Sequence, residues 1–354
     1  LEADASGEPL PIDHPLFVAF NELGLSFGMI NSSRTKGSAD GPSRNARTAI
    51  VAAEELAYWD QGATMSLPGP GLGGPPVNLL GTDEQKERFL KAPFRDKNTP
   101  GWGAYATTEP GAGSDVARIA TTAQRDGESY VLNGEKCFIT NGARANWVVI
   151  FATVDPSAGR AGHRAFIVER GTPGFTVGRI EKKMGLTASE TAGLRLENCR
   201  IPADNLLGGE EGAKGKAGFK VAMSTFDLTR PMVAVMAVGI GRTAWERASE
   251  VAKEAFSRNH PTPRERILLQ DLAEARRRLD AARLLCWRAA WKMDHKMTNT
   301  IEASMAKVVA PPAGLHAARV SMDVVAAAGV PYDRLVDKCF RDLKVFDIFE
   351  GTGE

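Results

Sequence analysis

The sequence contains little cysteine and histidine, and neither residue type is clustered. Its four cysteines are Cys137, Cys199, Cys286 and Cys339, and no two of them form a CxxC pair. Such spacing fits neither a zinc ribbon nor the disulfide framework of a small secreted domain. HxH and HxxxH spacings are typical of histidine metal sites. The five histidines of this sequence show neither spacing. We therefore predict reduced thiols, a reducing compartment and no bound metal.

An excess of charge of either sign is also missing. Lysine and arginine total 44 residues, aspartate and glutamate total 43, and the net charge is +1. Proteins that bind nucleic acid or acidic membranes through their overall field need a strong basic excess. We therefore expect no nucleic-acid partner, and any anionic ligand must be held by local groups.

Long apolar stretches are the third absence. The sequence has no run of about 18 apolar residues, the length that a membrane-spanning helix needs. Its first ten residues, LEADASGEPL, also lack the basic and then apolar pattern of a secretory signal. The sequence therefore predicts no membrane span and a cytoplasmic location.

What the sequence does contain is a change of hydrophobic period along 354 residues, enough for two or three domains. Helical spacing dominates the first hundred residues, as in Ala46–Trp59. Alternating, β-branched segments follow from Gly103 to about Asn205, and helical spacing returns after Gly218. This order predicts an α+β multidomain protein with a helical domain at 1–103, a β domain at 104–212 and a helical bundle at 213–354.

Several local expectations accompany this division. Residues 31–45 are almost free of apolar side chains and predict an exposed loop. Thr82 is a candidate N-cap for a helix that runs to Leu90. The stretch PGPGLGGPP at 68–76 is too rich in proline and glycine for an ordinary helix interior. Pro231 is expected to kink or start a helix. Apolar residues at helical spacing predict a buried face for one further helix: Leu268, Leu272, Ala275, Leu279, Ala282 and Cys286.

The closing stretch KVFDIFEGTGE contains one notable carboxylate, Glu350, between an apolar run and Gly351. A carboxyl group that loses solvation there has a raised pKa and becomes a better base. The following glycine allows backbone to approach a ligand closely. A helix that ends in a C-cap glycine beside a surface glutamate explains the same letters equally simply.

Upstream, the stretch YATTEPGAGSDVARI begins at Tyr105 and forms a glycine-rich turn between two strand-like segments. Hydroxyls at Thr107, Thr108 and Ser114, with backbone at Gly113, can place donors against a heterocycle or a phosphate. No clear helix follows, so the turn is not a dinucleotide-binding βαβ unit.

Taken whole, this stretch resembles the first signature of the acyl-CoA dehydrogenase family. KCFITNG (136–142) resembles that family's second flavin-contacting strand, GFKVAMSTFDLTRP (218–231) its helix beneath the substrate, and FEGTGE its catalytic loop. The four stretches occur in the family's order. The resemblance implies a helical N-terminal domain, a β-barrel-like middle domain and a C-terminal four-helix bundle.

The resemblance also implies a reaction. In this family a glutamate, here Glu350, removes the α-proton of an acyl-CoA thioester, and the β-hydrogen leaves as hydride to flavin N5 of FAD. The family's enolate-like oxygen is stabilised by the backbone N–H of that glutamate and by a flavin hydroxyl. The expected partners are the acyl-CoA substrate, an electron-transfer flavoprotein as electron acceptor, and further subunits in a dimer of dimers. The expected setting is fatty acid β-oxidation.

By position, the resemblance assigns roles to further residues. Those matched to FAD are Tyr105, Thr107, Thr108, Gly113, Ser114, Phe138, Thr140 and Arg258. Those matched to substrate are Ser114, Ser189, Asp227, Arg230 and Gly351. One subclass of the family carries its base where this chain has Thr229; threonine cannot act as that base, which leaves Glu350 as the candidate.

Some positions depart from the family pattern at the edge of FAD that a neighbouring subunit completes. His260 and Pro261 replace a Thr-Phe pair, Asp323 replaces a glutamine, and Ala326 and Ala327 replace two glycines. An aspartate near a pyrophosphate repels it. Two alternatives therefore stay open: a subunit of a hetero-oligomeric dehydrogenase with an incomplete FAD edge, and a flavin-poor scaffold protein on the same fold.

The substrate and the oxidant are less constrained. An acyl-CoA oxidase, in which reduced flavin meets oxygen, is a related possibility. The stretch at 68–76 corresponds to the far end of the family's acyl pocket, and its glycines and prolines suggest room for a broad or bulky acyl group.

Overall fold

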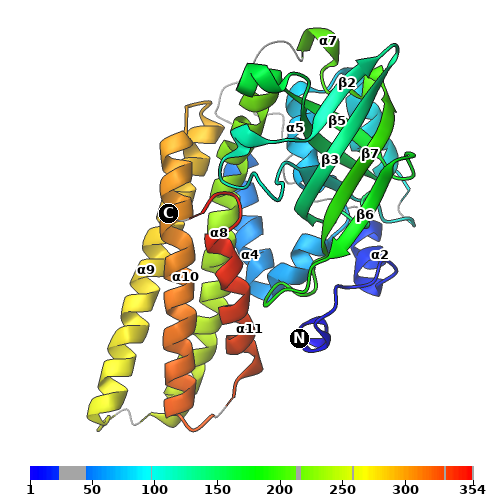
Figure 1. Ribbon diagram of the computed structural model, residues 1–354. Helices are drawn as coiled ribbons and strands as arrows, with labels where there is room; N and C mark the ends of the chain where they lie inside the picture. The colour runs from blue at the N-terminus through cyan, green and yellow to red at the C-terminus, as the bar shows by residue number, and fades with distance from the viewer. Residues whose placement is uncertain (24–44, 97, 213–216, 257–258, 331, 353–354) are drawn as a thin grey trace.

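The computed structural model describes residues 1–23, 45–96, 98–212, 217–256, 259–330 and 332–352. Figure 1 shows a bundle of long helices beside a curled sheet, with shorter helices packed around the sheet. The predicted loop at 31–45 lies outside the described residues apart from Asn45. The predicted succession of helices, strands and helices is confirmed as a three-domain fold.

The N-terminal helices are α1 (Glu2–Ser6), α2 (Pro15–Glu22), α4 (Asn45–Ser66), α5 (Gly74–Leu80) and α6 (Asp83–Lys86). Thr82 caps α6 as predicted, because its hydroxyl accepts the Gln85 N–H while the Gln85 side chain accepts the Thr82 N–H. Pro75 and Pro76 occupy the first turn of α5, where proline breaks no helical hydrogen bond.

Helix α4 is bent at Asp60, whose backbone is non-helical (φ −168°, ψ 106°). Its first half packs on the bundle, where Glu54 accepts hydrogen bonds from Arg242 and Arg283. Its second half is bonded to the β domain, because the Trp102 indole donates to the Ser66 carbonyl at 2.8 Å and the Asn141 amide donates to the Met65 carbonyl at 2.9 Å. The helix therefore joins the two halves of the molecule.

The middle domain is one seven-stranded sheet, ordered β1-β4-β2-β3-β7-β6, with β5 paired to β4. The strands are β1 (Gly103–Ala106), β2 (Thr122–Asp126), β3 (Ser129–Thr140), β4 (Trp147–Thr153), β5 (His163–Glu169), β6 (Phe175–Ile180) and β7 (Thr191–Pro202). Every residue of β4 is buried. Its alternate side chains, such as Ile150 and Val149, enter separate cores on the two faces of the sheet.

Glycines bring the stretch at 68–76 close to this sheet. A Cβ at Gly73 would lie 2.5 Å from the Ala104 carbonyl oxygen and 2.7 Å from the Trp147 ring, and one at Gly103 would lie 2.7 Å from the Pro70 carbonyl oxygen. Only glycine allows this approach. The glycines thus serve close packing against β1, which leaves the predicted room for a bulky acyl group without support.

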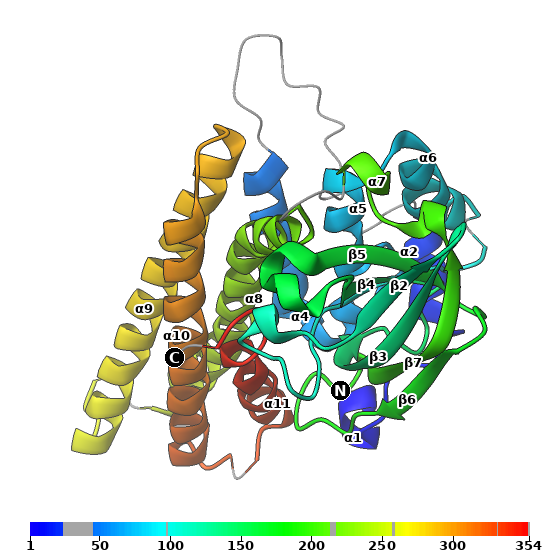
Figure 2. The same ribbon diagram turned by 45° about the horizontal axis from the view of Figure 1, so that its top comes forward.

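After the short helix α7 (Gly209–Gly212), the C-terminal domain consists of α8 (Ala217–Ala255), α9 (Pro263–Asp294), α10 (Thr300–Ala327) and α11 (Arg334–Leu343). The predicted apolar face of α9 is confirmed as buried. Pro231 lies inside α8, which continues through it. Both views place the C-terminal turn, drawn in red, against α8 and α10 on the side that faces the sheet (Figures 1 and 2).

Within the described residues, all four cysteines are free thiols. The same part of the chain contains no group of three or more His, Cys, Asp or Glu side chains arranged to hold a metal ion. None of its helices is long and apolar enough to cross a membrane.

Candidate active site

Glu350 lies on a tight turn that follows a short 3-10 helix, Lys344–Asp347. Phe346 is fully buried in the bundle core, and its ring packs edge-on against Phe349 at 5.0 Å between centroids. Glu350 itself has φ 59° and Gly351 has φ 105°. A left-handed conformation is uncommon for a glutamate and therefore marks a turn that its surroundings hold in place.

Three side chains from the bundle hold this turn. The Thr229 hydroxyl on α8 donates to the Glu350 carboxylate Oε2 at 2.6 Å. The Arg230 Nε donates to the Glu350 carbonyl at 3.2 Å, and the Lys307 ammonium on α10 donates to the Gly351 carbonyl at 2.9 Å. The carboxylate and two successive carbonyls of the turn are thus each bound by a different residue.

The electrostatics of Glu350 suit a base. Burial raises the pKa of this carboxyl above its ordinary value, whereas the Thr229 hydrogen bond and the charges of Arg230 and Lys307 act in the opposite direction. A carboxylate with a raised pKa holds a proton more strongly and accepts it more readily from a weak carbon acid. This environment favours the catalytic interpretation of Glu350 over a solvated helix end.

Tyr105 faces the bundle from β1. Its ring lies 5.2 Å from that of Phe151 and 6.4 Å from that of Phe226 on α8. Its hydroxyl and that of Thr107 are both buried, and neither has a partner with hydrogen-bond geometry among the described residues. Burial raises the pKa of Tyr105 and the charge of Glu350 adds to that shift, whereas the nearby Thr107 hydroxyl acts in the opposite direction. Buried polar atoms without partners are uncommon in proteins, and a bound ligand is one ordinary explanation.

A buried ion pair fixes both ends of the loop at 107–121. The Lys136 ammonium, which is completely buried, donates to the Glu109 carboxylate at 2.6 Å, the Thr107 carbonyl at 3.2 Å and the Phe151 carbonyl at 2.6 Å. Glu109 also accepts the Thr121 hydroxyl at 2.5 Å. All three ammonium hydrogens therefore have acceptors.

The pKa values of this pair follow from burial and from mutual attraction. Burial lowers the pKa of Lys136 to about 8, although Glu109 opposes that shift. Burial alone would raise the pKa of Glu109, but the lysine charge and its hydrogen bonds bring it below the ordinary value. Both groups are therefore charged at neutral pH.

Phe138 sits beside this loop in an irregularity of β3. The pairing of β3 with β7 shifts register between Lys136 and Ile139, and Phe138 has φ 58°. The Cys137 N–H leaves the ladder and donates to the Thr108 carbonyl at 3.0 Å. The Phe138 side chain is 64% exposed. A bulge that turns an aromatic ring out of the sheet, next to unpartnered hydroxyls, suits a flat aromatic ligand.

The structure places the other predicted residues less uniformly. Thr140 is half-buried on β3 opposite Thr191. Gly113 and Ser114 are exposed on the loop after β1. Ser189 is buried with an unpartnered hydroxyl, and its carbonyl accepts the Lys183 ammonium.

Two assignments need separate comment. Asp227 accepts the Thr300 hydroxyl at 2.8 Å, so its carboxylate ties α8 to the start of α10 and is not bound to Glu350. Arg258 lies outside the described residues. Its cofactor role stays a prediction.

Sequence reasoning missed two lysines. Lys136 interrupts a strand and Lys307 interrupts an apolar helical pattern, SMAKVVA, and both are at most 3% exposed. The available signal was a lysine at a position where the strand pattern or the helical pattern predicts a buried apolar side chain. Thr229 was considered only as an alternative base position, whereas it binds the predicted base.

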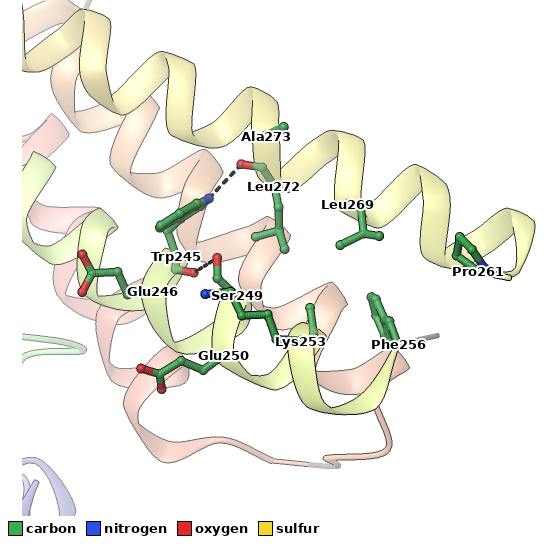
Figure 3. Close-up of a pocket in the computed structure, with 11 residues that line it drawn as sticks. Trp245, Glu246, Ser249, Glu250, Lys253, Phe256, Pro261, Leu269, Leu272 and Ala273 are labelled. Carbon is green, nitrogen blue, oxygen red and sulfur yellow. Dashed lines mark hydrogen bonds between the residues drawn. The ribbon is translucent and has the colours of Figure 1, made fainter. Parts of the chain in front are cut away.

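The bundle also contains a cavity of about 560 Å³ between α8 and α9, lined by Trp245, Phe256, Leu272 and others (Figure 3). The Trp245 indole crosses to α9, donating to the Leu272 carbonyl at 2.8 Å. None of the described residues assigned to the base, substrate or FAD lines this cavity, although Pro261, at the expected neighbour-subunit edge of FAD, does. Its size alone therefore does not make it the active site.

Comparison with known proteins agrees with this geometry. The N-terminal, middle and C-terminal domain models of acyl-CoA dehydrogenase match residues 3–95, 104–199 and 216–354. The mitochondrial short-chain specific acyl-CoA dehydrogenase of Bos taurus is 40% identical over 79% of this chain. That match spans 66% of the bovine protein, slightly less than two thirds of its length.

Solved structures agree as well. Butyryl-CoA dehydrogenase from Megasphaera elsdenii superposes with a TM-score of 0.85 at 35% identity, covering 99% of this chain and 89% of that one. A structure described as an electron transferring flavoprotein of Acidaminococcus fermentans superposes equally well, with a TM-score of 0.85 at 34% identity and the same coverage. The fold, the three matched domain models and the identity to the bovine protein together show that the chain belongs to the acyl-CoA dehydrogenase family.

Proposed function

We propose that the protein is an FAD-dependent acyl-CoA dehydrogenase in which Glu350 removes the α-proton of an acyl-CoA thioester. The observation that carries the proposal is the setting of Glu350. Its carboxylate has a raised pKa, accepts the Thr229 hydroxyl at 2.6 Å and lies on a turn held by two cations. At the alternative base position the chain has Thr229, whose hydroxyl donates a hydrogen bond to Glu350. This supports Glu350 as the single base.

The chain's own residues divide the work as follows. Thr229 orients the carboxylate, and the raised pKa makes Glu350 competent to accept a carbon-bound proton. No described residue accepts a hydrogen bond from the Glu350 N–H. We assign that N–H to the thioester oxygen, where a donor stabilises the charge that develops as the proton leaves.

FAD fits the groups opposite Glu350. Tyr105 and Thr107 supply two unpartnered hydroxyls, and Phe138 supplies an exposed aromatic ring on the strand that is hydrogen-bonded to their loop at Cys137 and Thr108. Thr108, Gly113, Ser114 and Thr140 complete the proposed set with Arg258. When bound, FAD supplies the acceptor for the β-hydride and so makes the dehydrogenation possible. The chain holds the ring and excludes water from it, with the loop at 107–121 fixed by Lys136 and Glu109.

The relatives' names favour a short acyl chain, since they include short-chain and butyryl-CoA enzymes. We therefore propose short straight acyl-CoA thioesters as substrates and assign Ser114, Ser189, Arg230 and Gly351 to substrate contacts. Asp227 acts through the α8–α10 junction. We propose an electron-transfer flavoprotein as the electron acceptor.

Exposed apolar side chains on α9 and α10 support assembly into a dimer of dimers. They include Leu284 at 70% exposed, Trp291 at 44%, Ile301 at 67% and Met305 at 52%. Exposed apolar area of this kind on neighbouring long helices often contacts another protein.

The domain boundaries at 103/104 and 212/213 also stay proposals.

A hetero-oligomer is a second candidate, favoured by the far end of the bundle. Asp323 and Ala326 are exposed on the last turns of α10, and His260 is exposed between α8 and α9. A neighbouring FAD at this end would meet a carboxylate and methyl groups. A partner chain with a different surface could supply the missing donors.

The test is Glu350→Gln, which keeps the shape of the side chain and removes the base. We expect the purified wild type to be yellow and to bleach when butyryl-CoA is added without oxygen. The variant should keep its flavin and its Thr229 contact, and lose bleaching by at least about 1,000-fold. A colourless wild type, alone and with any co-purified partner, would overturn the enzyme proposal. Undiminished bleaching in Glu350→Gln would place the base elsewhere.

A further inference from the structure

Lys307 is a buried cation that pairs with no carboxylate among the described residues. It is 3% exposed on α10, between Ala306 and Ala310, which are fully buried. Its one described hydrogen bond goes to the Gly351 carbonyl at 2.9 Å. The other deeply buried lysines behave differently: Lys136 binds Glu109 at 2.6 Å and Lys338 binds Asp342 at 2.5 Å.

This difference calls for an explanation, because an ammonium removed from water without a counter-ion is costly. Burial lowers the pKa of Lys307, and the charges of Asp347 and Glu350 act against that shift. Asp347 ends the 3-10 helix before the turn, and Glu350 lies on the turn itself. The carboxylates on and just before the turn that carries the predicted base therefore stabilise the buried charge of Lys307.

We propose that Lys307 is a positioning residue for the base, holding the left-handed turn at Glu350 and Gly351 through the Gly351 carbonyl. The inference rests on the proposed function of Glu350. It goes beyond it by assigning a role to a residue on another helix that the family resemblance matched to neither substrate nor cofactor.

The geometry explains why such a holder is needed. Gly351 has φ 105°, and glycine can leave that conformation for others at little cost. Rotation of the peptide after Gly351 would release the turn. Arg230 from α8 binds the Glu350 carbonyl and Lys307 from α10 binds the next one, so two helices fix successive peptides. A shift of about 1 Å in a catalytic group can cost about 100-fold in rate.

Lys307 also acts on the charge of the base. The groups that face Glu350 are Thr229 and Arg230 from α8, Lys307 from α10 and Tyr105 from β1, while Asp347 lies on its own segment and faces Lys307. Lys307 and Arg230 favour the ionised carboxylate, against burial. Removing Lys307 should therefore raise the pKa of Glu350, leaving less ionised base at neutral pH.

The experiment compares Lys307→Met, Lys307→Arg and the control Lys292→Met in the FAD-loaded protein. Lys292 is a bundle lysine bound to Glu302 at 2.5 Å, and it is not among the charged groups that act on Glu350 or Lys307. Flavin absorbance reports cofactor content, thermal unfolding reports the fold, and the pH profile of flavin bleaching by butyryl-CoA reports the base. Thermal unfolding across pH, with and without Glu350→Gln, reports the pKa of Glu350 independently of activity.

For Lys307→Met we expect retained flavin, a fall of about tenfold in the plateau bleaching rate and an acid limb moved up by about one pH unit. Lys307→Arg should move the limb back toward that of the wild type, and Lys292→Met should leave rate and limb unchanged. The Glu350-dependent part of the unfolding profile should move in the same direction as the acid limb.

Three outcomes would overturn the inference while leaving the proposed function intact. They are an unmoved acid limb and plateau in Lys307→Met, an equal shift in Lys307→Arg and Lys307→Met, or an equal shift in Lys292→Met. If Lys307→Met does not fold, Lys307→Gln takes its place, with the same expected fall in rate and raised acid limb and the same contradicting outcomes. A colourless wild type, or a yellow wild type that butyryl-CoA does not bleach, defeats the proposed function instead.

Discussion

Two backbone segments face each other across the candidate site, and they are held by opposite means. The loop at 107–121 is fixed by Lys136 and Glu109, a buried pair whose charges cancel and whose hydrogen-bonding groups are filled from the surrounding backbone. The turn at Glu350 is fixed by Arg230 and Lys307, which bind backbone carbonyls and leave positive charge beside the carboxylate.

The difference shows how one site can be rigid on one side and electrostatically biased on the other. A neutralised pair positions the segment assigned to FAD without adding net charge to it. Two cations bound to carbonyls position the base and also favour its ionised form. The following variants test this difference, in order of decreasing expected effect.

Lys136→Met should have the largest effect, because it leaves the Glu109 carboxylate buried and unpaired. We expect the free energy of unfolding to fall by about 3–5 kcal/mol, measured by urea denaturation. Arg200→Ala is the matched control on the same sheet, since the Arg200–Asp126 pair has side chains 55% and 60% exposed and should matter by about 1 kcal/mol or less.

A double variant sharpens that result. Lys136→Met with Glu109→Leu replaces the pair by apolar side chains and should recover most of the lost stability. Flavin affinity should stay reduced, because Thr107 and Thr121 lose their anchors. Full recovery of both quantities would mean that the pair does not position the loop.

Thr229→Val comes second, because it removes one hydrogen bond from the Glu350 carboxylate. A hydrogen bond to a charged group favours the ionised form, so its loss should raise the pKa of Glu350 and move the acid limb of kcat/KM up by about one pH unit. The control is Thr243→Val on the same helix, whose hydroxyl donates to the Tyr58 carbonyl at 2.6 Å. Equal pH profiles in the two variants would contradict the role of Thr229.

The smallest effect concerns stability and pH. Because burial raises the pKa of Glu350 above 4.5 in the folded protein, the folded state binds more protons than the unfolded state just above that pH. Wild-type stability should therefore fall as pH rises from 4.5 through the folded pKa, and Glu350→Gln should escape this fall. Solvent screens a half-buried carboxyl, so we expect a gain of about 1 kcal/mol or less at neutral pH and none below pH 4.5, measured by thermal unfolding.

Much of the fold could be predicted from the sequence because its hydrophobic period changes with its secondary structure. The buried face of α9 and the cap at Thr82 are local patterns, and both were correctly predicted. The close packing of the stretch at 68–76 against β1 could not be predicted, because the approach of Gly73 to Ala104 and Trp147 depends on contacts far along the chain.

The local setting of some candidate site residues could also be predicted, but their roles stay predictions. Glu350 stands in a recognisable stretch, and the hydroxyls near Tyr105 follow one strand. The partners of Lys136 and Lys307 could not be predicted, since each lysine meets its acceptors only after β1, β4 and the C-terminal turn come together. Sequence period can mark a charged residue as buried, but it cannot name what that residue binds.

The bend of α4 at Asp60 lets one helix contact both domains. The half before Asp60 is bound to the bundle through Glu54, and the half after it is bound both to the β domain and to Met236 of α8. Asp60 itself is bound to Lys338 of α11 at 3.3 Å. A single kinked helix thus links the sheet that carries Tyr105 to the bundle that carries Glu350, although it contributes no predicted site residue.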